Sequence, residues 1–132
     1  MTVLDTSALI DYLLGGGAAD QVQRLFDDEG ELAAPDLIVF ETLAVFRREA
    51  LRGTLPEQRL AGAIADLGDV PIELFPSLSL RERAWQLRHN LTIADALFLA
   101  LAESLQESLA TKDAALAAAA EQHASVRALR LS

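Results

Sequence analysis

The stretch VLDTSALIDYL, residues 3–13, places an aspartate directly after the first apolar run and two hydroxyl residues directly after the aspartate. The apolar run predicts a strand at residues 2–4, and the apolar spacing that follows predicts a helix at residues 7–14. The glycines at 15–17 should end that helix, because glycine readily adopts the left-handed conformation of a helix C-cap. Asp5 is therefore expected at the carboxyl end of a strand and at the start of a helix.

Strand and helix signals alternate in the same way to the end of the chain. This alternation predicts one α/β domain over residues 1–132, with a central, mainly parallel sheet of about four to five strands flanked by helices on both sides. Further strands are expected at residues 32–34, 72–75, 109–111 and 126–129. Further helices are expected at residues 20–26, 37–53 after a start at Pro35 and Asp36, 56–68, 78–89 with Asn90 as a left-handed cap, 92–105 and 114–123.

Apolar residues make up 52% of the chain, and many of them are alanine. Alanine buries little area, so the composition indicates closely packed helices with some apolar surface left for a protein partner. No apolar stretch reaches the roughly 18 residues that cross a bilayer, and no signal peptide is recognisable, so a soluble cytoplasmic protein is expected. The absence of cysteine excludes disulfides, thiolate nucleophiles and cysteine metal ligands.

Acidic residues outnumber basic residues by 20 to 11, and the net charge is −9. This balance argues against nonspecific attraction to a polyanion, so any contact with a nucleic acid must be local. Ten of the eleven basic residues are arginine, which can bind phosphate bidentately. Two arginine clusters are candidates for that contact, and the alternative is that they are solvated helix faces. The clusters are Arg47, Arg48 and Arg52, and Arg81, Arg83 and Arg88.

Two aspartates occupy equivalent places in the predicted fold. Asp5 follows the first strand, and Asp113 follows the strand at residues 109–111, two residues after a threonine hydroxyl. Each one can be explained as a helix N-cap, a role worth about 1 kcal/mol. However, both lie at the carboxyl ends of predicted parallel strands, where open parallel sheets gather their ligand-binding groups. This coincidence favours a functional site.

Two further acids lie within predicted helices. Asp95 follows Thr92 by three residues, so a capping role is the alternative to a role in a site. Glu41 interrupts the apolar segment LIVFETLAVF, where an unpaired buried carboxylate would be costly. For Glu41 the alternative is a partly exposed helix face.

A cluster of these four acids would need cations or protons. Like charges about 4 Å apart repel by about 4 kcal/mol for each pair at an effective dielectric constant near 20. Ligands that are all oxygen suit Mg²⁺ or Mn²⁺ rather than zinc. His89 and His123 have no ligand-like spacing and are interpreted as surface residues.

Four segments of the chain together resemble PIN-domain nucleases, in particular the VapC-type toxins of bacterial toxin–antitoxin pairs. They are VLDTSALIDYL with Asp5, PDLIVFETL with Glu41, TIADALFLALAE with Asp95 and LATKDAAL with Asp113. Each segment is short, but their order, spacing and strand or helix contexts are specific and extend over nearly the whole chain. The resemblance implies a PIN-like fold.

The resemblance also implies a hydrolase, namely a metal-dependent endoribonuclease. In that family the acids matching Asp5, Glu41, Asp95 and Asp113 surround one or two Mg²⁺ or Mn²⁺ ions, and the hydroxyls matching Ser7 and Thr111 support the acids. A metal-activated water attacks the RNA phosphodiester in line. Asp5 and Asp95 are then the expected direct ligands, whereas Glu41 and Asp113 would bind the metal through water or orient the nucleophile.

Protein partners follow from the same resemblance. It implies a homodimer and a small VapB-like antitoxin that wraps around the toxin, often with a basic side chain placed near the acids. Lys112, beside Asp113, is expected to point to solvent, and phosphate binding is the alternative.

Two other classes of protein remain open. The first is a catalytically silent module that keeps the fold as an interaction scaffold. The second is a small-molecule phosphohydrolase of the haloacid-dehalogenase type, or a receiver domain with a phosphorylated aspartate. The haloacid-dehalogenase interpretation requires a second acid two residues after the nucleophile, and this chain has Ser7 there.

Overall fold

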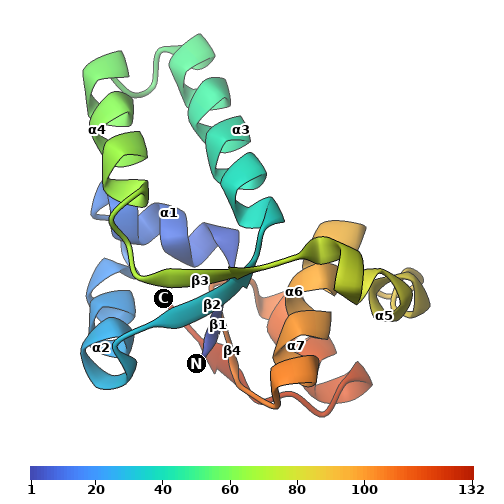
Figure 1. Ribbon diagram of the computed structural model, residues 1–132. Helices are drawn as coiled ribbons and strands as arrows, with labels where there is room; N and C mark the ends of the chain where they lie inside the picture. Colours follow the sequence, from blue (N-terminus) through green and yellow to red (C-terminus); the bar gives the residue numbers. More distant parts are fainter.

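The computed structural model describes residues 1–132 and contains one five-stranded sheet in the order β3-β2-β1-β4-β5 (Figure 1). All neighbouring strands are parallel. The strands are β1 (Val3–Leu4), β2 (Leu32–Pro35), β3 (Ile72–Phe75), β4 (Leu109–Thr111) and β5 (Ala128–Arg130). The expected α/β fold is confirmed, and every neighbouring pair in the sheet is parallel.

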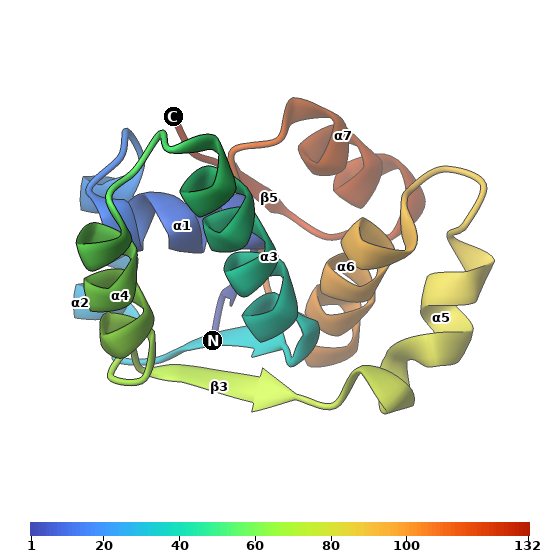
Figure 2. The same cartoon turned by 90° about the horizontal axis from the view of Figure 1, so that it is seen from above.

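Helices cover both faces of this sheet (Figures 1 and 2). From β1 to β3 the chain adds strands outward on one side, with one set of helices. β4 then returns to the other side of β1, and the later helices cover the opposite face (Figures 1 and 2), as the right-handed rule for parallel crossovers predicts. The first set is α1 (Thr6–Leu14), α2 (Ala19–Glu29), α3 (Leu37–Arg52) and α4 (Glu57–Leu67). The second set is the short 3₁₀ helix η1 (Ser77–Leu80) with α5 (Arg81–Gln86), α6 (Ile93–Leu105) and α7 (Ala114–His123).

Helix ends follow the capping signals of the sequence at several places. Asp5 caps α1, because its carboxylate accepts the N–H of Ala8. Gly15 ends the same helix at φ 73°, a left-handed conformation that costs a residue with a Cβ more than it costs glycine. Gly53 ends α3 in the same way at φ 70°.

The segment expected to form one helix at residues 78–89 is shorter and divided, so this prediction is wrong in its bounds. It forms η1 and α5, and Leu80, the last residue of η1, precedes α5 at φ −100° and ψ −1°. Asn90 is not left-handed, because the carbonyl of Leu87 accepts the N–H groups of both Asn90 and Leu91 and closes the turn earlier. Burial of Leu80 and Leu87 holds this segment against the core.

Two strand boundaries also differ from the predicted ones. Pro35 does not begin α3 but ends β2, where it pairs with Phe75. Asp36 precedes α3 without a capping hydrogen bond, and its carboxylate instead accepts the N–H and the hydroxyl of Ser77. The last strand lies at 128–130 rather than 126–129, in register with β4 through the pair formed by Thr111 and Arg130.

The hydrophobic core lies between the sheet and its two helix layers, and α6 is its central helix. Its buried residues are Ala96, Phe98, Leu99, Ala100, Leu101 and Ala102. The alanines let α6 approach β1, β2 and β4 closely, as the alanine-rich composition indicates. None of the helices has the length and apolar character that crossing a membrane would require.

Candidate active site

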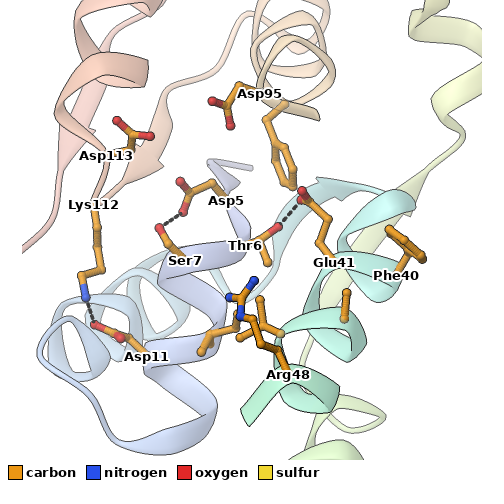
Figure 3. Close-up of a pocket in the computed structure, with 14 residues that line it drawn as sticks. Asp5, Thr6, Ser7, Asp11, Phe40, Glu41, Arg48, Asp95, Lys112 and Asp113 are labelled. Carbon is orange, nitrogen blue, oxygen red and sulfur yellow. Dashed lines mark hydrogen bonds and ion pairs between the residues drawn. The ribbon is translucent and has the colours of Figure 1, made fainter. Parts of the chain in front are cut away.

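The carboxyl ends of β1 and β4 lie next to each other at the place where the strand order reverses. This switch point is where parallel α/β sheets open a crevice for ligands. Asp5 follows β1, and Asp113 follows β4. The first turn of α6 brings Asp95 to the same edge, and the second turn of α3 brings Glu41. Figure 3 shows the four carboxylates around one hollow.

Asp5 is buried, with 6% of its surface exposed, and its two carboxylate oxygens accept three hydrogen bonds. Oδ1 accepts the hydroxyl of Ser7 at 2.9 Å and the N–H of Ala8 at 3.0 Å. Oδ2 accepts the hydroxyl of Thr111, which comes from β4. These donors fix the carboxylate in one orientation. Two of them are the hydroxyls of Ser7 and Thr111, to which the family resemblance gives a supporting role.

Thr111 connects two of the acids. While its hydroxyl donates to Asp5, the same oxygen accepts the N–H of Asp113 at 2.9 Å. Asp113 is exposed and caps α7, where its Oδ1 accepts the N–H groups of Ala115 and Leu116. Its other oxygen makes no hydrogen bond and remains free for a ligand.

Glu41 and Asp95 complete the arrangement from opposite helix layers. Glu41 is half-buried, and its Oε1 accepts the hydroxyl of Thr6 at 2.6 Å (Figure 3). Asp95 is half-buried as well, and its N–H donates to the hydroxyl of Thr92 at 3.2 Å. The capping role expected of Thr92 is therefore present, and it leaves the Asp95 carboxylate pointing toward the hollow.

A cleft of about 570 Å³ contains all four predicted acids and Ser7. Thr111 is buried beneath it and contacts two of its lining residues, Asp5 and Asp113. Its remaining lining residues were not assigned to a site by the sequence, except Arg48 and Lys112, which were considered as phosphate ligands. They are Thr6, Ile10, Asp11, Phe40, Ala44, Val45, Arg48, Phe98 and Lys112.

The electrostatics of the cleft reflect the proximity of the acids. Burial raises the pKa of Asp5 above its ordinary value, although the hydrogen bonds from Thr111, Ala8 and Ser7 oppose the shift. Burial also raises the pKa of Asp95, and repulsion by Asp113, Asp5 and Glu41 adds to it. The influence of all three other acids on Asp95 means that the four carboxylates interact through space.

The donor set suits a hard divalent cation, because every candidate ligand is an oxygen. The side chains alone do not form a closed metal site, since no group of three or more His, Cys, Asp or Glu residues stands close enough to hold an ion together. Mg²⁺ commonly binds through one or two carboxylates and keeps several waters. The arrangement therefore fits an ion held by two of the acids, with water between the ion and the others.

Asp11 is a charged residue of the cleft that the sequence analysis missed. Its Oδ2 lies 2.6 Å from the Nζ of Lys112 (Figure 3). The expectation that Lys112 points to solvent is wrong, because this ion pair draws its side chain along the wall of the cleft. Asp11 could have been found by the argument used for Glu41. It also interrupts an apolar helical segment, ALIDYLL, where an unpaired carboxylate would be costly.

The two arginine clusters have different surroundings. In the first, all three arginines are exposed on α3 and form no ion pair, and Arg48 is the one that lines the cleft.

The arginines of the second cluster contact neighbouring side chains of the same chain. Arg83 binds Glu103 through two hydrogen bonds of 2.7 and 3.0 Å, and Arg88 stacks on Trp85 at 4.5 Å. Arg81 lies 3.7 Å from Glu82. His89 and His123 are exposed, as predicted.

The parallel sheet and the acids at its switch point define a PIN-domain protein, and comparison confirms this class. The PIN domain family model matches residues 2–122, so the chain belongs to the PIN-domain family. Within it, the chain is similar to Ribonuclease VapC1 of Mycobacterium tuberculosis, with 39% identity over 118 residues and 89% of each chain covered. The expected resemblance to VapC-type proteins is thereby confirmed.

Two further relatives show how wide this similarity is. Ribonuclease VapC12 of Mycobacterium tuberculosis is 31% identical over 117 residues, which cover 89% of this chain and 90% of the relative. Ribonuclease VapC3 of Pyrobaculum aerophilum is 27% identical over 119 residues, which cover 87% of this chain and 91% of the relative. All three alignments extend over most of both chains.

Proposed function

We propose that this protein is a Mg²⁺- or Mn²⁺-dependent endoribonuclease that acts as the toxin of a toxin–antitoxin pair. The observation that carries the proposal is the convergence of Asp5, Glu41, Asp95 and Asp113 on one cleft at the switch point of the sheet. The ribonuclease names of the VapC relatives support the choice of RNA as substrate.

The acids have different roles in this proposal, and their surroundings suggest the division. A bound divalent ion would offset the negative charge of the scissile phosphate and lower the pKa of a water molecule, so that the resulting hydroxide could attack the phosphorus. Asp5 is the ligand held most rigidly, because its orientation is set by three donors. Asp95, whose pKa is raised by burial and by the other three acids, is the second direct ligand.

Glu41 and Asp113 act in this scheme by orienting water. Glu41 keeps one carboxylate oxygen free while Thr6 donates to the other, and Asp113 keeps its Oδ2 free while Oδ1 caps α7. A carboxylate with one anchored oxygen and one free oxygen can accept a proton or a hydrogen bond from water without changing its position. Both acids are placed to hold the attacking water or the leaving group.

The net charge of −9 is compatible with an RNA substrate if positive charge is supplied where the strand binds. Arg48 is the arginine that the cleft contains, and it forms no ion pair there. Side chains read a single strand more readily than an RNA duplex, so we expect the target to be single-stranded. A VapB-like antitoxin and a second copy of the chain in a homodimer are the proposed protein partners.

The test uses protein purified free of any partner and a mixture of cellular RNAs as substrate. Cleavage should require Mg²⁺ or Mn²⁺, stop with EDTA, and disappear in the Asp5→Asn, Asp95→Asn double variant. The matched control is Asp66→Asn, Asp69→Asn, which changes two exposed acids outside the cleft and should cleave like the wild type. Equal cleavage by both double variants would defeat the proposal.

A catalytically silent scaffold predicts a different result in a second measurement. Calorimetric titration with Mn²⁺ should show uptake by the wild type and by the Asp66→Asn, Asp69→Asn control, and weak or no uptake by the Asp5→Asn, Asp95→Asn variant. No uptake by the wild type, together with no cleavage, would favour the scaffold.

A further inference from the structure

The ion pair between Asp11 and Lys112 joins α1 to the loop between β4 and α7 along one wall of the cleft (Figure 3). Its partners are 101 residues apart in the chain and 2.6 Å apart in space. The Asp11 side chain is 16% exposed, and the Lys112 side chain is 35% exposed. Lys112 directly precedes Asp113, but its side chain runs away from Asp113 along the wall of the cleft (Figure 3). The ion pair therefore holds the ammonium group at Asp11, in the same cleft that the four acids line.

Both members of the pair are held by further contacts. The carboxylate of Asp11 also accepts the N–H of Ala18 at 2.9 Å. The turn after α1 comes so close that a Cβ on Gly16 would lie 2.6 Å from Oδ1 of Asp11, so this turn requires glycine there unless the carboxylate moves. On the other side, Arg130 donates to the carbonyl of Lys112 at 2.9 Å and fixes its backbone.

The Lys112 ammonium keeps unused hydrogen-bonding capacity. An ammonium group has three N–H donors, and the one hydrogen bond that Nζ makes goes to Asp11. Two donors therefore remain for a ligand in the cleft. Arg48, which comes from α3, is the other cation of this cleft, so the two positive charges come from different elements (Figure 3).

We propose that Lys112 binds an RNA phosphate adjacent to the scissile one, and that Asp11 and Gly16 are positioning residues that hold its ammonium group in place. The proposal rests on the proposed ribonuclease function. Lysine binds phosphate as a point charge on a flexible stem, so its contribution depends on how much freedom it loses on binding. The ion pair with Asp11 reduces that loss in advance, because the stem is already ordered in the free protein.

Lys112→Gln should therefore weaken substrate binding and leave the chemical step almost intact. We expect KM for a single-stranded oligoribonucleotide to rise about tenfold while kcat changes less than twofold. The slope of log K against log salt concentration should become shallower by about 0.7, the value for one phosphate contact on a single strand. Lys112→Arg should keep the wild-type slope.

If Asp11 acts by positioning Lys112, changing Asp11 should affect KM only while Lys112 is present. Asp11→Asn and Gly16→Ala should each raise KM about threefold in the wild-type background and have no further effect in the Lys112→Gln background. A purely structural role would lower the melting temperature of both backgrounds equally and leave the salt slope unchanged. A lower KM in Asp11→Asn would show that Asp11 restrains Lys112 from binding and would overturn the positioning role.

Arg127→Gln is the matched control. Arg127 is exposed and precedes β5, so it lies at the opposite end of the parallel sheet from the cleft. The same loss of one positive charge should leave KM and the salt slope within error of the wild type. Equal changes in Arg127→Gln and Lys112→Gln would show a general charge effect and would overturn the proposal.

Lys112 is the only lysine of the chain, which permits a direct readout of contact. An oligoribonucleotide should protect Lys112 from acylation by an N-hydroxysuccinimide ester, as measured by mass spectrometry in the Asp95→Asn background, where cleavage is slow.

If the wild type cleaves RNA but Lys112 is not protected and Lys112→Gln keeps the wild-type KM, this inference fails and the nuclease function stands. If the wild type does not cleave RNA, both fail.

Discussion

The two junctions β1–α1 and β4–α7 have the same local plan and different environments. Each places an aspartate after a strand of the same sheet, uses it as a helix N-cap and includes a neighbouring hydroxyl residue. Asp5 is buried and hydrogen-bonded at both oxygens, whereas Asp113 is exposed and hydrogen-bonded at one. A local motif therefore positions each carboxylate, while the place of the strand in the sheet decides how far the carboxylate is buried.

The position of each strand explains this difference. β1 is the central strand of the sheet, with β2 on one side and β4 on the other, so the residue that follows it is covered by neighbours. β4 has β5 as its outer neighbour, and its loop reaches the rim of the cleft. Burial at the first junction raises the pKa of Asp5.

The largest expected effect is on the rate of RNA cleavage, which should fall further when Asp5 is changed than when Asp113 is changed. Asp5→Asn should slow RNA cleavage by a factor on the order of 10³ or more, comparable to removing a preorganised electrostatic group from an active site. Asp113→Asn should slow it by roughly 10–100-fold, the usual cost of a group that orients water or a ligand. Initial rates at saturating Mg²⁺ measure both. Equal losses would show that burial does not separate their roles.

The next effect concerns Thr111, which connects the two junctions. Thr111→Val keeps the shape of the side chain but removes the donor to the buried Asp5 carboxylate and the acceptor for the Asp113 N–H. The free energy of unfolding should fall by roughly 2–3 kcal/mol, as expected for a hydrogen bond to a buried charge. Urea denaturation measures this change.

Two comparison variants sharpen the Thr111 result. Asp113→Ala removes an exposed N-cap and should cost about 1 kcal/mol. Ser7→Ala removes a hydroxyl at an exposed position, so water can replace it, and its cost should be smaller than that of Thr111→Val. If Ser7→Ala and Thr111→Val cost the same, the two hydrogen bonds to Asp5 are equivalent despite their different burial.

The smallest effect is the dependence of stability on pH in the metal-free protein. Asp5 and Asp95 have pKa values raised above the ordinary 3.8, so the folded state retains protons that the unfolded chain has released. The free energy of unfolding should therefore fall as the pH rises from about 4 through the raised pKa values, by at most about 1.4 kcal/mol per pH unit for each proton. Chemical denaturation at a series of pH values in EDTA measures the slope.

Variants at the two junctions show how much each aspartate contributes to the change of unfolding free energy with pH. Asp5→Asn should flatten it, because the buried ionisable group is gone. Asp113→Asn should flatten it less, since burial is the larger cause of both shifts and repulsion by Asp113 adds to it. An equal slope in the wild type and in Asp5→Asn would mean that the pKa of Asp5 is not raised in the folded state, contrary to its burial.

Much of the fold could be predicted because its elements follow local patterns. The apolar runs, the glycines after α1 and α3, and the apolar α6 all lie where expected. The divided segment of η1 and α5 could not be predicted, because its buried residues Leu80, Ala84 and Leu87 keep the spacing of one continuous helix. The conformation of Asn90 could not be predicted either, because the helix ends earlier, in a turn closed by the carbonyl of Leu87.

The candidate site shows a similar division. The four acids could be proposed because each stands at a strand end, a helix start or inside an apolar run, and all four line the cleft. Asp11 also stands inside an apolar run and could have been proposed in the same way. Its pairing with Lys112 could not, because a lysine beside an aspartate in sequence gives no indication of a second aspartate on α1. Arg48 could be grouped with other arginines but not separated from Arg47 and Arg52 until the face of α3 toward the cleft was known.

By itself, the sequence determined the order of strands and helices and the placement of carboxylates at their junctions, since periodicity and capping act over a few neighbouring residues. The hydrogen bond from Thr111 to Asp5, across 106 residues, and the ion pair of Asp11 with Lys112, across 101, arise from the packing of the folded chain. Those contacts depend on β4 pairing with β1, and the order of strands in a sheet is selected by packing of the whole chain rather than by any local spacing.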